Sequence, residues 1–307
     1  GLRGLQKGRI RRRDKTAVCV AIFPIVPLAG RVKTVRHDIQ SETQEGLRMK
    51  RYSVFAIAKE ALNYHMGWEK AWASPAPKKE YDAIIVGAGG HGLATAYYLG
   101  KNHGITNVAI IEKGWLGGGN TGRNTTIIRS NYLQDSSAAI YEKARSLYET
   151  MSQDLNYNVM FSPRGLLMLA QTHHEIRGYQ RTAHANALQG VATEWIGPAK
   201  VKELVPIINI DGPRYPVLGA LYQARGGTAR HDAVAWGYAR ACSAMGMDII
   251  QQCEVKGVKT EGGVVKGVET SKGYIGCKKL GIVVAGHSGQ LADMAGFRLP
   301  VEAVALQ

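Results

Sequence analysis

The residues with the clearest chemical pattern in this sequence are three glycines spaced as G-x-G-x-x-G: Gly87, Gly89 and Gly92. Between a strand and a helix, such a turn places backbone N–H groups and the positive end of the helix dipole against a pyrophosphate. Gly87 permits the tight turn, Gly89 lets the backbone approach the phosphates, and Gly92 allows close helix–strand packing. Glu112 lies twenty residues after Gly92, where a carboxylate accepts hydrogen bonds from both ribose hydroxyls. We therefore predict a dinucleotide site, against the alternative of a glycine turn that binds nothing.

The elements needed to hold this turn lie on both sides of it. The apolar run 83–86 predicts a short buried strand, a helix runs on from Leu93, and 107–111 predicts a second strand that ends on Glu112. These pieces form a complete β-α-β unit. An acidic residue at position 112 disfavours a ribose 2′-phosphate, so FAD or NAD is favoured over NADP.

Two features favour FAD. A glycine-rich stretch, 117–126, offers backbone donors to a large flat ring, although by itself it is also compatible with a plain polar linker. Later in the chain a strand, a hairpin at Gly262 and Gly263, and a closing strand from Leu280 to Ala285 are expected to close the nucleotide site from the other side.

The region between these two parts alternates helix-like and strand-like segments. Residues 136–155 predict a helix, 164–171 a strand, and 231–246 a second helix. The apolar positions at helical spacing are Ala139, Tyr141, Ala144, Leu147, Tyr148 and Met151 in the first helix, and Val234, Tyr238, Cys242 and Met245 in the second.

We predict an α/β fold of two intertwined domains. A Rossmann-type, glutathione-reductase-like FAD domain is expected to comprise 81–133 and 226–296, and an antiparallel-sheet substrate domain 134–225 and 297–307. Because the chain stops where a new strand would begin, the substrate domain is expected to be truncated at its C-terminus.

Residues 49–80 are expected to form a leading helix and the proline-rich linker, 73–79, that ends it. Met49 is the expected natural start, and 1–48 is interpreted as a non-native upstream extension. The alternative is a cleaved export signal, because a basic run precedes the apolar segment 17–30.

The net charge of +15 is concentrated at one end of the chain. The first 50 residues hold 12 Lys and Arg against 4 Asp and Glu, so the remainder is only mildly basic and does not predict nucleic-acid binding. No segment predicts a membrane span. Four cysteines, without metal-ligand spacing, are interpreted as free thiols of a cytoplasmic protein: Cys19, Cys242, Cys253 and Cys277.

From Arg51 onward the sequence resembles the β subunits of heterotetrameric sarcosine oxidases and, more broadly, the FAD-dependent amine-oxidising proteins of the D-amino-acid-oxidase group. The stretches that carry the resemblance are 81–132, 161–170, 226–241, 248–255 and 285–288. The first of these is long and specific, whereas residues 1–48 match no pattern of the family.

The resemblance implies non-covalent FAD and a second flavin, FMN, bound covalently to His231. An imidazole nitrogen is chemically able to add to an electrophilic flavin methyl group. Without the resemblance, His231 would be interpreted as a packed or solvent-facing histidine. The FAD contacts carried over from the family are Gly87, Gly89, Gly90, His91, Gly92, Glu112, Asn120, Arg123, Asn124, Thr126, Ile127 and Val255.

The resemblance also places the substrate carboxylate on Arg129, whose guanidinium has the geometry to bind it through two hydrogen bonds. The alternative is a structural or surface arginine. The paired histidines of single-chain relatives are replaced here by Thr121 and Gly122, so their base chemistry does not transfer. A family lysine associated with oxygen would fall beyond Gln307.

The implied function is the β subunit of a sarcosine oxidase. FAD is reduced as sarcosine is oxidatively demethylated to glycine, electrons pass through FMN to dioxygen to give hydrogen peroxide, and the imine carbon passes to tetrahydrofolate. The implied partners are α, γ and δ subunits, with tetrahydrofolate and NAD on α. The alternatives are a single-flavin glycine or D-amino-acid oxidase or dehydrogenase, and a non-catalytic FAD-binding partner subunit.

Overall fold

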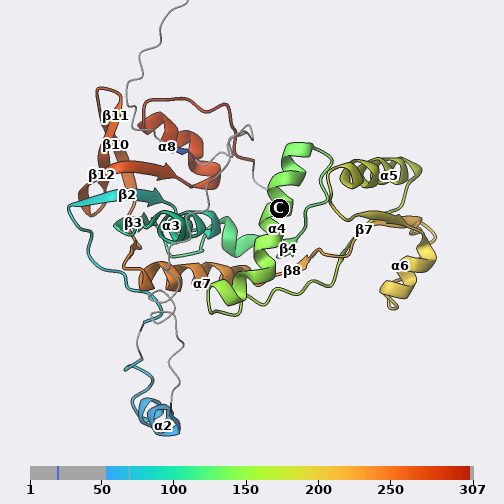
Figure 1. Ribbon diagram of the computed structural model, residues 1–307, viewed down its shortest axis with the longest axis horizontal. Helices are drawn as coiled ribbons and strands as arrows, with labels where there is room; N and C mark the ends of the chain where they lie inside the picture. The colour runs from blue at the N-terminus through green and yellow to red at the C-terminus, as the bar shows by residue number, and fades with distance from the viewer. Residues whose placement is uncertain (1–18, 21–52, 69, 305–307) are drawn as a thin grey trace, which may run out of the picture.

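A mixed seven-stranded sheet dominates the part of the chain that the computed structural model describes, residues 19–20, 53–68 and 70–304 (Figure 1). Its parallel part runs in the order β12 (Gly273–Ile282), β2 (Glu80–Val86), β3 (Val108–Ile111) and β9 (Asp248–Ile250). The antiparallel strands β10 (Val255–Glu261) and β11 (Val264–Thr270) extend it beyond β12. The short β1 (Cys19–Val20) pairs in parallel with the end of β12.

Both faces of the parallel part are buried, which explains why β2 and β3 are continuous apolar runs. Ile85 and Ile110 face α3 (Gly90–His103) and α7 (His231–Ala244), and their neighbours Ile84 and Ile111 face the opposite layer. That opposite layer contains α8 (Ser288–Met294), which lies above the sheet in Figure 1. The predicted apolar face of α7 packs in the first layer, where Val234, Tyr238 and Cys242 are buried.

The closing strand differs from its prediction. We predicted a strand from Leu280 to Ala285, but β12 begins at Gly273 and ends at Ile282, opposite Val86, the last residue of β2. Ala285 has a φ of +50° and opens the short 3-10 helix η2 (Ala285–His287), so it cannot continue the strand. The hairpin prediction was right, since Gly262 and Gly263 have positive φ between β10 and β11.

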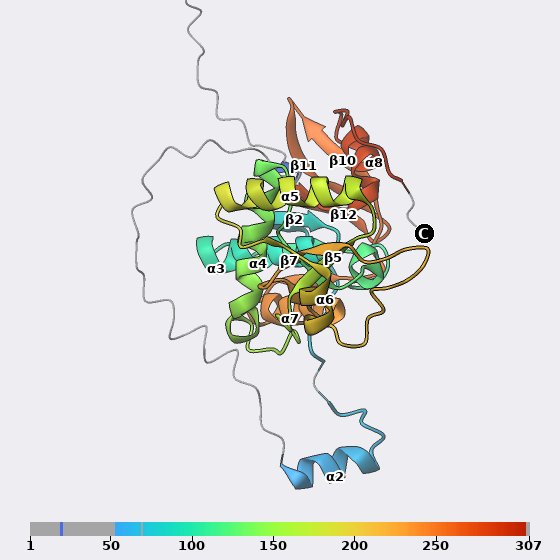
Figure 2. The ribbon, with the colours of Figure 1, turned by 90° about the vertical axis from the view of Figure 1, so that its right-hand side faces the viewer.

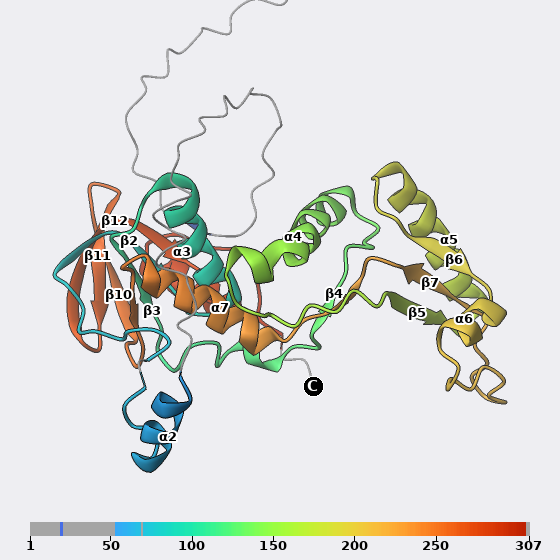
Figure 3. The same cartoon turned by 60° about the horizontal axis from the view of Figure 1, so that its bottom comes forward.

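A second, smaller sheet lies at the other end of the molecule (Figures 1 and 3), and faces the viewer in Figure 2. It is antiparallel, with β7 (Gly219–Gln223) between β5 (Leu166–Ala170) and β6 (Glu194–Ile196). The helices beside it are α5 (His173–Leu188), which begins with a capping box of Thr172 and Glu175, and α6 (Pro198–Leu204). Together these elements confirm the predicted α/β fold with a second, antiparallel sheet. The predicted domain boundaries remain a prediction.

Helix α4 (Asp135–Asp154) lies between the two sheets, together with the crossing pair β4 (Ile127–Ile128) and β8 (Gly227–Thr228) (Figure 3). The predicted apolar face of this helix was partly wrong. Ala139 and Tyr141 are exposed, whereas Ala138, Arg145 and Met151 are buried. A buried arginine was not predicted because its carboxylate partners had not been recognised from the sequence.

The leading helix is shorter than predicted, because α2 (Val54–Leu62) ends well before the proline-rich linker. Tyr64 and His65 have φ of +52° and +59°, which no α-helix accommodates. Residues 1–48, interpreted from the sequence as an upstream extension, lie outside the described residues except for 19–20. The helix stands apart from both sheets in Figures 1 and 2.

The three cysteines whose side chains are described, Cys242, Cys253 and Cys277, are free and buried. Burial raises the pKa of Cys242 to about 12 and that of Cys277 to about 11, so both thiols are protonated at neutral pH. Among the described helices, none combines the length and the hydropathy that a membrane span requires.

The crossing pair leaves no room for a side chain at Gly227, where a Cβ would overlap the Ser162 carbonyl and the Cα of Pro163. We expect Gly227→Ala to lower the free energy of unfolding by about 1–3 kcal/mol, as overpacking does in a closed site. Urea unfolding checks this. The matched control is Gly178→Ala in α5, where a Cβ meets no atom and should raise stability by about 0.5–1 kcal/mol. Equal effects of the two substitutions would contradict the crossing constraint.

Candidate functional site

The carboxyl ends of three parallel strands lie at one edge of the large sheet. Val86 of β2 lies in register with Ile111 of β3 and Ile282 of β12. The backbone continues this alignment past the strands, since Gly87 N donates to Ile111 O at 2.8 Å and Val283 N donates to Val86 O at 2.9 Å. In open α/β sheets, ligands bind beyond the carboxyl ends of the strands.

The glycine turn at this edge is closed by backbone contacts. Gly87 has a φ of +106°, and a Cβ there would collide with the carbonyl of Val283. A Cβ on Gly92 would collide with the carbonyl of Gly87. The helix therefore starts directly against the strand end, which is the role predicted for Gly87 and Gly92.

The first turn of α3 presents backbone donors at the same edge. Gly89 is the N-cap and carries no side chain that could occupy these N–H groups. Thr121, from the loop after β3, accepts a hydrogen bond from Gly90 N at 2.9 Å through its hydroxyl oxygen. In the sequence, Thr121 stands out only because single-chain relatives have a histidine there. The contact of Thr121 with α3 is visible only in the folded chain.

Glu112 joins the glycine turn to the loop that follows β3. One carboxylate oxygen accepts from Ala88 N at 3.0 Å and the other accepts from Gly114 N at 2.9 Å. Each carboxylate oxygen has a second lone pair, so these two bonds leave acceptor capacity for ribose hydroxyls. The backbone around Glu112 is also fixed, because its N–H donates to Ile250 O and its carbonyl accepts from Cys253 N.

A cavity of about 1340 Å³ opens at this edge between α3, the strand ends and α8. It brings together residues that are up to two hundred positions apart in sequence. The predicted FAD contacts that line it are Gly87, Gly89, Gly90, His91, Gly92, Glu112, Asn120, Arg123 and Val255. Its wall also includes 282–288 and Leu291 of α8. From the sequence, this part was connected to the site only by the predicted closing strand and by the family resemblance at 285–288.

Three predicted contacts do not line the cavity, namely Asn124, Thr126 and Ile127. Asn124 instead shapes the loop, since its side chain accepts from Thr126 N at 2.7 Å and donates to Thr121 O at 2.6 Å. These bonds follow the 3-10 helix η1 (Asn120–Arg123) and hold Thr126 at a φ of +63°. Ile127 is half-exposed on β4.

His231 is the first residue of α7 and lies outside this cavity. Its Nδ1 is buried and, among the described residues, has no hydrogen-bond partner. The preceding segment is held by Ala229 N, which donates to Thr126 O at 3.0 Å, so the end of the glycine-rich loop lies beside the start of α7. Arg230 pairs with Asp232 at 2.8 Å next to the histidine.

Arg129 directly follows β4, on the irregular segment that leads toward the second sheet. Its Nη1 donates to the side-chain oxygen of Asn131 at 2.9 Å and approaches the sulfur of Met168 at 3.9 Å. The guanidinium lies 4.2 Å from the centre of the Tyr132 ring, and that ring stacks on Tyr141. In all hydrogen bonds of Arg129 to described residues, the donor is thus Nη1.

A family model described as FAD dependent oxidoreductase matches residues 82–307. The chain belongs to the FAD-dependent oxidoreductase family. Sarcosine oxidase subunit beta of Rhodobacter capsulatus is 79% identical over 259 residues, which cover 84% of this chain and 63% of that protein. The protein of the same name from Arthrobacter sp. is 57% identical over 240 residues, covering 78% and 59%. The predicted resemblance is confirmed, and this FAD-dependent oxidoreductase spans about three fifths of these relatives.

Solved structures support the fold. L-proline dehydrogenase from P. horikoshii matches with a TM-score of 0.66 and 27% identity over 72% of this chain and 56% of that one. Glycine oxidase from Geobacillus kaustophilus also reaches 0.66, at 21% identity, over 73% and 60%. FAD fits the observed cradle, since the absent Cβ atoms and the helix start leave the strand ends open to a pyrophosphate.

The bridging role of Glu112 gives a test of the site that needs no cofactor. Glu112→Ala leaves the N–H groups of Ala88 and Gly114 without their acceptor, so we expect the free energy of unfolding to fall by about 1–3 kcal/mol. Urea unfolding measures this. Glu254→Ala removes the same charge from an exposed cavity-rim residue and is expected to change stability by less than about 0.5 kcal/mol. Similar losses in both variants would refute the bridging role.

Proposed function

We propose that this chain is the FAD-binding part of a sarcosine oxidase β subunit that oxidises the N-methyl carbon of sarcosine. The observation that carries the proposal is the 79% identity to a protein named sarcosine oxidase subunit beta. The geometry supports it, because the dinucleotide cradle and Arg129, an arginine of a chemical type suited to bind a carboxylate, lie on connected segments of the chain.

FAD would be held at the strand ends. The first turn of α3 would bind the pyrophosphate, Glu112 the adenosine ribose, and Val255, 8% exposed on the cavity wall, would contact the adenine. The loop from Asn120 to Ile127 would follow the rest of the cofactor, with Asn124 and Thr126 supporting its conformation. When bound, FAD supplies the two-electron oxidation, and the protein orients it.

Arg129 would bind the carboxylate of sarcosine. Since Asn131 occupies only Nη1, the Nε and Nη2 donors have no acceptor among the described residues and are left for a planar anion. Stacking on Tyr132 fixes the plane of the guanidinium, which reduces the entropy lost when a carboxylate binds.

His231 would carry FMN covalently. Its Nδ1 is buried, so Nε2 is the nitrogen left to form the bond to the flavin. The nucleophile in this bond would be the neutral imidazole, because only the neutral ring has a free nitrogen lone pair. Electrons would pass through this flavin to dioxygen, giving hydrogen peroxide.

The complete enzyme would include α, γ and δ subunits and act in the cytoplasm. The imine carbon would pass to tetrahydrofolate on the α subunit, which would also hold NAD. The names of the relatives, which are subunits, support an assembly of several chains.

Arg129 gives the first kinetic test, in the full-length assembled enzyme. We expect Arg129→Met to raise KM for sarcosine by about 100-fold, because a partly buried, charged hydrogen-bond partner is lost. The KM of Arg129→Lys should lie between those of the unsubstituted enzyme and Arg129→Met, since an ammonium keeps the charge but lacks the planar pair of donors. Steady-state kinetics measure both. The control Arg177→Met removes an exposed arginine of α5 and should leave KM unchanged. An unchanged KM in Arg129→Met would remove the carboxylate role.

His231 gives the second test. After acid precipitation of the assembled enzyme we expect yellow colour in the protein pellet and, after proteolysis, a flavin-bearing peptide that contains His231. His231→Asn should abolish both, whereas His184→Asn, an exposed histidine of α5, should not. A colourless pellet from the unsubstituted enzyme would favour a single-flavin glycine or D-amino-acid oxidase. Absence of flavin reduction by sarcosine without oxygen would favour a non-catalytic partner subunit.

A further inference from the structure

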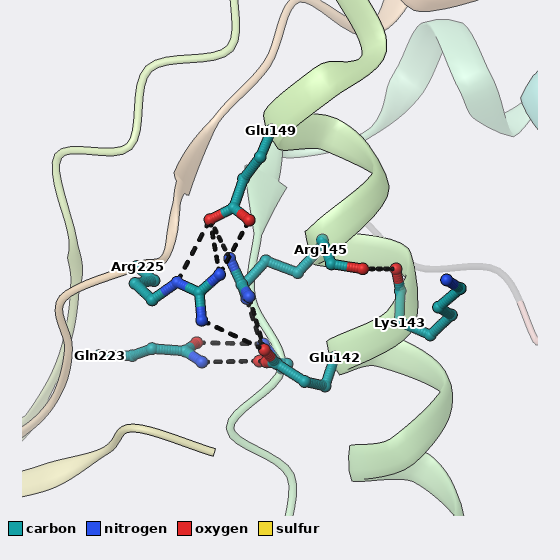
Figure 4. Close-up of polar contacts among 8 residues, drawn as sticks. Glu142, Lys143, Arg145, Glu149, Gln223 and Arg225 are labelled. Carbon is teal, nitrogen blue, oxygen red and sulfur yellow. Dashed lines mark hydrogen bonds and ion pairs between the residues drawn. The ribbon is translucent and has the colours of Figure 1, made fainter. Parts of the chain in front are cut away.

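A polar cluster with a buried centre lies where α4 meets the segments that connect the two sheets (Figure 4). We call it the junction cluster, and it consists of Ser130, Glu142, Arg145, Glu149, Gln223 and Arg225. Ser130, Arg145 and Gln223 are at most 1% exposed. Buried polar groups without partners are costly, so each bond within this cluster constrains the structure.

Ser130 and Gln223 bind each other reciprocally across 93 positions of sequence. Ser130 N donates to the Gln223 side-chain oxygen at 3.0 Å, which orients the amide so that its nitrogen donates to Ser130 Oγ at 2.6 Å. The hydroxyl of Ser130 has a single proton, and with Gln223 acting as donor that proton goes to Glu142. Three side chains thus form one directional chain of hydrogen bonds.

Glu142 is held in place by a buried guanidinium. Arg145 Nε donates to one carboxylate oxygen of Glu142 at 3.0 Å, and Nη2 binds the other. Arg145 Nη1 pairs with Glu149 at 2.7 Å, and Arg225 closes the outer side of the cluster against Glu149 at 2.8 Å. The Arg145 guanidinium, with the Ser130 hydroxyl, holds the pKa of Glu142 below its usual range, so the carboxylate remains an acceptor at neutral pH.

The residue next to Ser130 in the chain is Arg129. Its guanidinium is fixed from its own segment, by Asn131 and by the Tyr132 ring, and from the second sheet by Met168. The same segment is fastened at its far end, where Asn186 of α5 donates to Tyr132 O at 2.7 Å. The position of the guanidinium therefore depends on where the backbone at Ser130 is held.

We propose that Glu142 is a positioning residue for Arg129, acting through Ser130 and Gln223 to fix the segment that carries the guanidinium proposed to bind the substrate carboxylate. This inference rests on the proposed function of Arg129. It assigns to the junction cluster a role in substrate binding in addition to its structural one.

The positioning role and a simple charge effect predict opposite changes. Replacing Glu142 by Gln removes a negative charge near the site, which by Coulomb attraction alone would tighten binding of an anion. Loss of positioning instead weakens binding. Glu149 supplies a matched control, because it lies on the same helix, pairs with the same Arg145 and carries the same charge, but makes no bond to Ser130.

The test is steady-state kinetics with sarcosine in the assembled full-length enzyme. We expect Glu142→Gln to raise KM by about tenfold, equivalent to ~1.4 kcal/mol, with a smaller change in kcat. Ser130→Ala should raise KM by a similar factor, although it changes no charge. Glu149→Gln should leave KM within about twofold or lower it, as a pure loss of negative charge does.

Each outcome decides between the two roles. If Glu142→Gln and Glu149→Gln change KM equally, or if Glu142→Gln lowers KM, the positioning role is wrong. If Glu142→Gln does not fold, Ser130→Ala carries the decision alone, and an unchanged KM there overturns the proposal. Arg129→Met in the same series distinguishes failure of the positioning role of Glu142 from failure of the proposed function. An unchanged KM in that variant overturns the carboxylate role of Arg129 itself.

Discussion

The structure depends on one contact without side chains, the approach of Gly92 to the carbonyl of Gly87. A methyl group at position 92 would push α3 away from the end of β2. Because the helix starts against the strand, the first turn of α3, Glu112 and the turn after β12 all line the same cavity. The pyrophosphate end of the site is therefore built from backbone that is held by sheet register.

A second constraint acts at the junction between the two sheets, and its physics is different. There the chain buries an arginine between two carboxylates instead of packing apolar side chains. Such a cluster adds little net stability, because desolvation offsets the attraction, but it is directional. Directionality matters at this place, since the segment that crosses from the large sheet to the second sheet also carries Arg129. The cradle and Arg129 are thus connected by one short stretch of chain.

Part of the site was predictable from the sequence because its determinants are local. G-x-G-x-x-G, the apolar run before it and Glu112 at the end of the next strand all lie within one β-α-β unit. The positions that were not recovered depend on distant partners. Thr121 accepts from Gly90 N, 31 positions before it, Ser130 binds Gln223 as well as Glu142, and β12 ends where β2 ends. None of these contacts leaves a periodic signal in its own segment.

The sequence by itself determined the fold class, the dinucleotide turn and the family, since hydrophobic period, glycine spacing and motif order are properties of short stretches. Only the tertiary structure decided which predicted residues share the cavity, which ones support its loop, and how Arg129 is oriented. The reason is that a hydrogen bond or a steric contact requires two groups within a few ångströms, and the chain brings most of these pairs together only when the strands align.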